Sequence, residues 1–242
     1  MKNLSAFPSE ERRAFLRRAA GSGLAIIVAG ASRRAAAAPA AKKPGDDDED
    51  VSPTEDLMRE HGILRRLLLV YGEAVRRLEG KEDVKPEPIA RSAEIVRTFI
   101  EDYHERDEEE YLFPRFEKAK KLVDLVTTLR AQHQAGRKLT ADILRLATAA
   151  GLASATDRAN LVDGMRRFVR MYEPHAARED TVLFPAFRVL VGEKELDRLR
   201  DVFEDKEKAL PGGGFEKMVD AVTAIETSMG VADLAQFTPR GT

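Results

Sequence analysis

Apolar side chains recur at steps of three or four residues along most of the chain after residue 52, which is the spacing of a helix buried along one side. The first such stripe consists of Leu57, His61, Leu64, Leu68 and Val75. Ser52-Pro53-Thr54-Glu55 is suited to begin this helix, because serine caps it, proline fits the first turn and glutamate completes a capping box. Gly80 is suited to end it.

The same pattern predicts five further helices. They run from about Glu87 to Leu112-Phe113-Pro114, from about Lys120 to Ala150, from about Thr156 to Leu183-Phe184-Pro185, from Glu193 to Ala209 and from Phe215 to Met229. We expect both Leu-Phe-Pro segments to bend or end their helices, because proline lacks an N–H donor and clashes with the preceding turn. The glycines at 212–214 follow no predicted strand, which favours a hinge over a phosphate-binding loop.

The four histidines of the chain mark a repeat. His61 precedes His104 by 43 residues and His133 precedes His175 by 42, and each falls on the apolar stripe of a different helix. Two helical hairpins of this kind can bury their stripes against each other, which neither can do alone. The sequence therefore predicts an all-α fold: an up-down-up-down four-helix bundle over residues 52–190, with one or two additional C-terminal helices over 191–242.

The composition restricts the chemistry of any site. There is no cysteine among the 242 residues, so disulfides, thiolate zinc sites and cysteine-held iron–sulfur clusters are excluded, and a metal must be bound by nitrogen and oxygen. A formal net charge of −2 gives no reason to expect nucleic acid as a partner. The arginine pairs Arg65-Arg66, Arg76-Arg77 and Arg166-Arg167 alternate with acidic residues, which favours solvated helix faces.

Residues 1–40 have the features of an export signal. Glu11-Arg12-Arg13-Ala14-Phe15-Leu16-Arg17 resembles the twin-arginine signal, an apolar stretch follows over 19–31, and Ala38-Pro39-Ala40 matches a cleavage site. The apolar stretch is too short for a permanent membrane span. Residues 41–51 are predicted to be a disordered linker. We therefore expect the twin-arginine export machinery to deliver the protein to the periplasm or the exterior; a disordered basic tail is the alternative.

Two of the histidines lie in copies of one motif. His104-Glu105-Arg106-Asp107-Glu108 precedes the first Leu-Phe-Pro segment, and His175-Ala176-Ala177-Arg178-Glu179 precedes the second. Residues four apart on a helix share a face, so each copy directs an imidazole and a carboxylate to one point. A single histidine on an apolar stripe is more often an ordinary core residue than a ligand. Four imidazoles and two carboxylates buried together would be costly unless paired, and metal ions would remove that cost.

On these residues the sequence, from about Glu55 to Phe187, resembles the hemerythrin family in its bacterial HHE-type branch. The resemblance rests on the two Leu-Phe-Pro segments and on His61, His104, Glu108, His133, His175 and Glu179. It implies a four-helix bundle around a centre of two non-haem iron ions. His61 and His104 would bind one iron and His133 and His175 the other, while both glutamates would bridge them.

The chain departs from oxygen-carrying hemerythrins, which use a fifth histidine beside the third-helix ligand, where this chain has Leu129 and Arg137. Four imidazoles, two bridging carboxylates and a bridging oxide or hydroxide supply about ten of the roughly twelve bonds of two octahedral irons. About two positions therefore stay open. Glu101, Glu105 and Tyr172 are candidates for extra ligands, although an ordinary role beside the site is the simpler interpretation, and Glu109 and Glu110 are interpreted as solvated.

The resemblance implies that the protein binds or reacts with dioxygen, or with a related small ligand such as peroxide or nitric oxide. Together with the predicted export signal, it places this function in the cell envelope. The missing histidine argues against a simple carrier and for a reactive centre that removes peroxide or handles iron; catalytic turnover stays open. The competing interpretation is an iron- or redox-sensing module that signals through residues 193–229. A zinc site and a bundle without ligand are the remaining alternatives.

Overall fold

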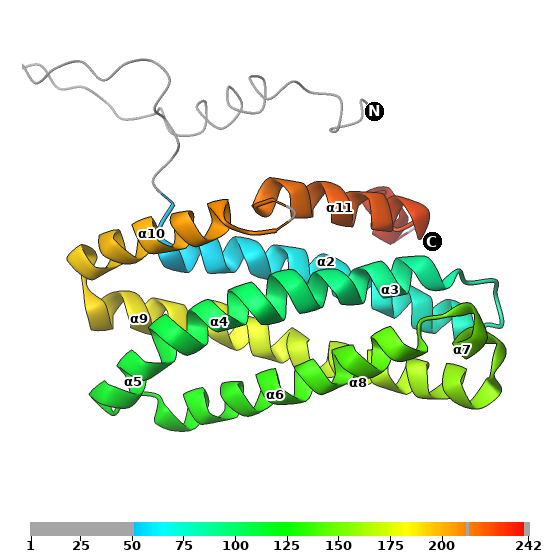
Figure 1. Cartoon of the computed structure of the whole chain (residues 1–242), viewed down its shortest axis with the longest axis horizontal. Coiled ribbons are helices and arrows are strands. Elements are labelled where there is room, and N and C mark those ends of the chain that lie inside the picture. Colours follow the sequence, from blue (N-terminus) through cyan, green and yellow to red (C-terminus); the bar gives the residue numbers. More distant parts are fainter. Residues whose placement is uncertain (1–50, 212, 240–242) are drawn as a thin grey trace, which may run out of the picture. The chain divides into compact units, whose positions relative to one another are not determined.

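The computed structural model describes residues 51–211 and 213–239. The predicted export signal and nearly all of the predicted linker lie outside these residues. Every regular element in the described ranges is helical, which confirms the predicted all-α class (Figure 1). None of the helices in these ranges is long and apolar enough to cross a membrane.

Helical arms that run in alternating directions form the bundle (Figure 1). The first arm is α2 (Pro53–Glu79), which begins at the predicted cap, since the Ser52 hydroxyl accepts the Glu55 N–H at 3.3 Å. The second arm consists of α3 (Pro86–Ile95), η2 (Val96–His104), α4 (Glu105–Asp107), η3 (Glu108–Leu112) and α5 (Phe113–Ala119). The third is α6 (Val123–Leu146), and the fourth consists of α8 (Ala155–Arg178), η4 (Glu179–Leu183) and α9 (Phe184–Val191). Helix α8 packs against both α2 and α6.

The third arm is shorter than the sequence predicted. Lys120 and Leu122 adopt positive φ angles of 54° and 49°, which a right-handed helix cannot include, so α6 begins after them. Beyond its end a separate short helix, α7 (Ala149–Ala153), is capped by Thr148, whose hydroxyl accepts the Gly151 N–H at 3.0 Å. This cap replaces the last predicted turn of the third helix.

The segments η2, η3 and η4 are π-helical, and η3 and η4 begin at the glutamates of the repeated motif. The N–H of Phe113 bonds to the carbonyl of Glu108, and the N–H of Phe184 bonds to that of Glu179, five residues back in each case. Of the two expected outcomes, a bend or an end of the helix, the end does not occur, because α5 and α9 follow directly. The wider π turn places each proline in the first turn of a new α-helical segment, where no N–H donor is needed.

Two clusters of buried apolar side chains fill the bundle. One includes Tyr71, Phe168 and Tyr172, and the other includes Phe113 and Phe184. His61 and His133 contact the second cluster through Phe184 and Phe113, His175 contacts the first through Tyr172, and all four histidines are at most 3% exposed. The histidine layer therefore lies between two apolar regions that separate it from solvent.

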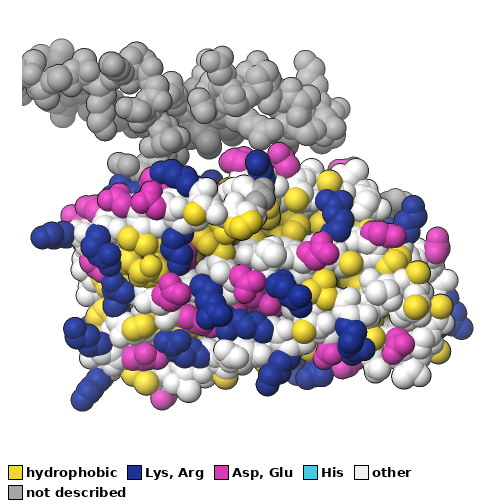
Figure 2. All heavy atoms as spheres, viewed as in Figure 1, with side chains coloured by type: hydrophobic (Ala, Val, Ile, Leu, Met, Phe, Trp, Pro, Cys, Tyr) yellow, Lys and Arg dark blue, Asp and Glu magenta, His cyan; other side chains and the backbone are white. Residues whose placement is uncertain are grey.

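Helices α10 (Glu193–Lys208) and α11 (Phe215–Ser228) pack on the outside of the bundle against α2, and a 3-10 turn, η5 (Leu234–Phe237), follows (Figure 1). Arg66 Nε donates to Glu226 of α11 at 3.0 Å, and Arg77 Nη2 donates to the carbonyl of Met229 at 2.7 Å. The interpretation of the arginine pairs as solvated is therefore wrong for Arg66 and Arg77, whereas the other four, Arg65, Arg76, Arg166 and Arg167, are exposed. On the face drawn in Figure 2, acidic and basic side chains are intermingled and no histidine is visible.

Candidate metal centre

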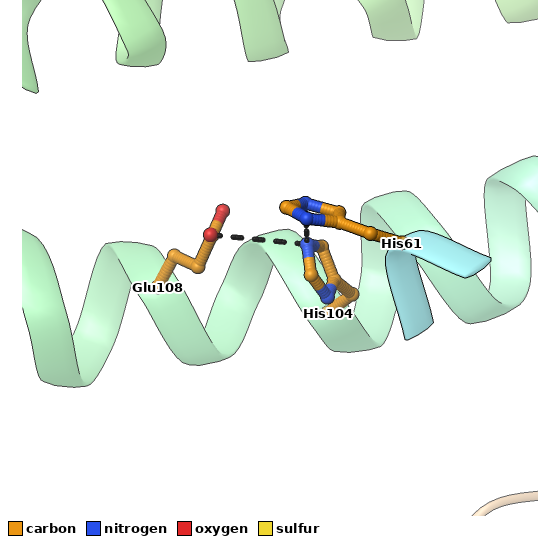
Figure 3. Close-up of side chains that lie close together, drawn as sticks. All are labelled: His61, His104 and Glu108. Carbon is orange, nitrogen blue, oxygen red and sulfur yellow. Dashed lines mark hydrogen bonds and ion pairs between the residues drawn. The ribbon is translucent and has the colours of Figure 1, made fainter. Parts of the chain in front are cut away.

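Six side chains from all arms of the bundle meet in its interior. They are His61 of α2, His104 of η2, Glu108 of η3, His133 of α6, His175 of α8 and Glu179 of η4, each at most 3% exposed. Nε2 of His104 lies 3.1 Å from Nε2 of His61 and 3.8 Å from Glu108 Oε1 (Figure 3). The other oxygen of Glu108 is 3.4 Å from Nε2 of His133. The structure thus brings together all six residues that the sequence singled out.

Both glutamates lie between histidines of different hairpins. Glu179 Oε2 is 3.3 Å from Nε2 of His61 and 3.0 Å from Nε2 of His175, just as Glu108 faces one imidazole of each hairpin. Each hairpin also supplies two imidazoles and one carboxylate whose ligand atoms lie within 4.8 Å of one another. This geometry suits two metal ions joined by two bridging carboxylates.

The outer nitrogen of every imidazole is hydrogen-bonded to an oxygen. The pairs are His61 Nδ1 with Asp180 Oδ1 at 2.7 Å, His104 Nδ1 with Glu60 Oε2 at 2.6 Å, His133 Nδ1 with Glu109 Oε1 at 3.0 Å, and His175 Nδ1 with Gln132 Oε1 at 2.9 Å. The ionised carboxylates of Asp180 and Glu109 and the amide oxygen of Gln132 only accept, so Nδ1 of His61, His133 and His175 carries the proton and Nε2 faces the centre. Partners of this kind fix the ring and raise its basicity as a metal ligand.

The pKa values of the two central carboxylates are shifted in opposite directions. Burial and the facing charge of Glu179 raise the pKa of Glu108 well above its ordinary value. Burial acts in the same direction on Glu179, but the neighbouring imidazoles, His175 foremost, outweigh it and hold the pKa of Glu179 well below its ordinary value. Burial also lowers the pKa of His104 and His133, which keeps both rings neutral at neutral pH and able to bind a cation.

Several inner atoms of the site are among the buried polar atoms without a hydrogen-bond partner in the described residues. Both oxygens of Glu108, both oxygens of Glu179 and Nε2 of His133 are buried without a hydrogen-bond partner among the described residues. Such atoms are destabilising, and folded proteins rarely contain them without a compensating partner. A cation between the imidazoles and carboxylates would pair with all of them. The residues present therefore fit a metal bound by nitrogen and oxygen, such as iron.

Comparison with known proteins agrees with this geometry. A family model described as the hemerythrin HHE cation binding domain matches residues 52–187 and also residues 124–228. The chain belongs to the hemerythrin HHE family. An uncharacterized protein of Mycobacterium tuberculosis is 49% identical over 191 residues, which cover 78% of this chain and 74% of that protein, and an uncharacterized protein of Mycobacterium bovis matches to the same extent. No solved structure matches the chain significantly.

In this hemerythrin-family site the candidate extra ligands Glu105 and Tyr172 face away from the centre. Tyr172 Oη donates to Glu105 Oε1 at 2.6 Å, and Arg137 Nη2 lies 2.9 Å from Glu105 Oε2. Glu105 approaches His133 from its outer side, with Oε2 3.9 Å from Nδ1. Glu101 belongs to none of the groups of potential ligand atoms in the described residues. The simpler interpretation of these residues, a role beside the site, therefore agrees with the geometry.

Arg137 and Leu129, which stand where the hemerythrin oxygen carriers have a fifth histidine, do not reach the centre either. Arg137 Nη2 lies 2.9 Å from Glu109 Oε1 as well as from Glu105, and Leu129 is packed in an apolar cluster. Glu105, Glu109 and His133 form a third group of potential ligand atoms within 4.8 Å. The guanidinium already pairs with both carboxylates of this group, so a cation is not needed there.

The sequence did not predict the outer partners of the imidazoles. These are Glu60, Glu109, Gln132 and Asp180. The interpretation of Glu109 as solvated is wrong, because its side chain is only 12% exposed and accepts from an imidazole. The repeat contains the pattern that identifies them. Glu60 and Gln132 each precede the first histidine of a hairpin, and Glu109 and Asp180 each follow a central glutamate.

Replacing Arg137 by alanine is expected to lower the free energy of unfolding by about 2–4 kcal/mol, because Glu105 and Glu109 lose their cation. The matched change Arg65→Ala removes the equivalent contact with Asp180. Since the Arg65 side chain is 44% exposed and that of Arg137 only 20%, we expect Arg65→Ala to cost less than about 1 kcal/mol. Urea unfolding of both variants without metal measures the two losses. Equal losses would contradict the prediction.

Proposed function

We propose that the protein holds a non-haem di-iron centre that binds or reacts with dioxygen, or with a related small ligand such as peroxide or nitric oxide. One iron would be bound by His61 and His104, the other by His133 and His175, and the bridges would be Glu108 and Glu179. The proposal is carried by the position of these two carboxylates, each between imidazoles of different hairpins. Two matching sets of nitrogen and oxygen ligands suit a binuclear centre better than a single zinc ion.

Iron at this site would supply the electrons for reducing dioxygen or peroxide. The residues of the chain would hold the imidazoles in place and exclude bulk water. The Phe184 ring stacks on His61 and the Phe113 ring stacks on His133, each with ring centroids 5.5 Å apart. The outer hydrogen bonds keep each ring in one orientation, so the ligand geometry is present before a metal or substrate arrives.

The ligand count supports a reactive centre over a carrier. Neither Arg137 nor Leu129 contributes to the inner face, so the six ligands leave coordination positions for a small molecule. More open positions than in an oxygen carrier favour reaction and autoxidation over stable binding. We therefore place peroxide removal or iron handling ahead of oxygen transport.

Exposing the reduced protein to oxygen under spectroscopic observation tests the function. The protein is loaded with about two irons per chain, one for each ligand set, and reduced without oxygen. Rapid bleaching to the oxidised spectrum, with peroxide consumed over many turnovers, would support a reactive centre. A stable oxygen-dependent band that reverses under vacuum would support carriage instead. An iron-loaded protein that does neither would contradict the proposal and favour a sensor. The metal-free protein is the control.

We also propose export by the twin-arginine route, on the strength of the motif at residues 11–17. This route carries folded proteins, so iron can be bound before the protein meets copper or zinc, which such ligands hold more tightly. Changing Arg12-Arg13 to Lys-Lys is expected to retain the protein in the cytoplasm. Cell fractionation measures the result, with the unchanged protein as control. Unchanged secretion would indicate another pathway.

A further inference from the structure

One end of the bundle is formed by the connection between α5 and α6 together with the connection between α9 and α10 (Figure 1). Helices α5 and α9 meet there, since the centroids of the Phe116 and Phe187 rings are 5.9 Å apart. Exposed apolar side chains belong to both connections: Leu122 is 36% exposed, Val123 39% and Val189 84%. Half of the large exposed apolar side chains of the described residues therefore belong to this end.

The α5–α6 connection has an unfavourable backbone conformation at its apolar residue. Lys120 and Leu122 have φ angles of 54° and 49°, in the left-handed region that bulky residues rarely adopt. Glycine or asparagine would fit this conformation at less cost. Backbone strain of this kind is found mainly at functional sites. A strained and exposed leucine therefore indicates a contact for which an apolar side chain is needed.

Unpaired cations flank these apolar side chains in the sequence. The exposed cations that form no ion pair with another described residue are Lys118, Lys120, Lys121, Arg188 and Lys194. The acidic side chains of the two connections that are unpaired in the same sense are Asp124 and Glu193. Glu117 and Glu195 are neutralised, because they pair with Arg130 and Arg115. This end of the bundle thus has an excess of positive charge around its apolar residues.

We propose that this end of the bundle binds peripherally to an anionic lipid surface, with Leu122, Val123 and Val189 entering the headgroup region. A lipid surface offers negative charge beside an apolar phase, which suits cations and apolar side chains on one surface. Nucleic acid would offer the charge without the apolar phase. Lysines can bury their methylene groups at such a surface and keep the ammonium group in water. The inference goes beyond the proposed function, because no proposed metal ligand belongs to these connections.

Binding is expected to be reversible and sensitive to salt. Each basic side chain close to an anionic surface strengthens binding about fivefold, and high ionic strength screens this attraction. Changing Lys118, Lys120 and Lys121 to glutamine is therefore expected to weaken binding at least about tenfold. Leu122→Asn is expected to weaken binding about threefold or more and to raise the melting temperature, since asparagine tolerates the left-handed conformation. A folding defect would not change the two quantities in this way.

Sedimentation with vesicles of phosphatidylcholine, with and without phosphatidylglycerol, tests the inference at low and high salt. The chain is measured in full and also cut after Ala40, at the predicted cleavage site, so that binding by the basic residues 1–40 is measured separately. All packing described above involves residues that this cut retains. The matched control changes Lys81, Lys85 and Arg91 to glutamine, which removes the same charge from exposed, unpaired side chains at the opposite end of the bundle (Figure 1).

The inference is supported if the cut chain binds only the vesicles with phosphatidylglycerol, and if the lysine variant and Leu122→Asn bind less while the control does not. No binding at low salt, equal binding to both kinds of vesicle, or equal weakening by the lysine variant and the control would overturn it. A dimer in size-exclusion chromatography that Leu122→Asn dissociates would also overturn it, because the apolar residues would then contact a second copy of the chain.

Discussion

Replacing Glu179 by alanine is expected to reduce the iron content of the purified protein from about two ions per chain to one or fewer. The carboxylate lies 3.3 Å from Nε2 of His61 and 3.0 Å from Nε2 of His175, so it connects the two hairpins at the centre. Its removal would take an oxygen ligand from each of the two proposed irons. Because it is an inner ligand, the loss of affinity should exceed the roughly 10–100-fold typical of an outer partner. Glu108→Ala is expected to act in the same direction.

Metal analysis and iron-dependent near-ultraviolet absorption measure this effect. Glu173→Ala is a matched control, since Glu173 is an exposed glutamate of α8 close to His175 in the sequence. That variant should keep its full iron content. Two irons retained by the Glu179→Ala protein would show that Glu179 is not a bridging ligand.

Removing the metal from the wild-type protein is expected to lower its melting temperature by about 8–16 °C. A ligand present at 1,000 times its Kd, and bound only by the folded state, stabilises that state by about 4 kcal/mol. For a chain of this size, ~1 kcal/mol corresponds to about 2–4 °C. Without a cation, the oxygens of Glu108 and Glu179 stay buried and lack hydrogen-bond partners among the described residues.

Scanning calorimetry with and without a chelator measures the change, and iron added back without oxygen should restore the original transition. The Glu179→Ala variant serves as the control, because it has little metal to lose and its melting temperature should hardly respond to the chelator. A wild-type melting temperature that is independent of the chelator would contradict the prediction that a bound metal ion stabilises the fold.

The helices and the meeting of the six site residues could be predicted because their signals are local and repeated. An imidazole and a carboxylate four residues apart share a helix face, and the apolar stripe shows that this face is buried. The π turns could not be predicted in this way. A hydrogen bond between Phe113 and Glu108 has no residue preference of its own, so proline was the only visible signal there, and it indicated a bend or an end of the helix.

The outer partners were missed because their residue types have other common uses. Glu109 stands in the acidic run at 108–110, where charge alone indicates solvent. What determines its role is His133, 24 residues later and on another arm, which becomes its neighbour only when the hairpins pack. Glu60 and Gln132 likewise act across a hairpin. Such roles follow from tertiary contacts and not from local spacing.

The π turns also fix the length of the repeated motif. The turn that begins at Glu108 contains one residue more than an α-helical turn. Deleting a residue between Glu108 and Phe113 would rotate the rest of the arm by about 100° around its axis, away from the stacking contact with His133. The same holds between Glu179 and Phe184. Relatives that keep the central glutamates and the Phe-Pro pairs must therefore keep the number of residues between them, whereas the connections between arms are free to change in length.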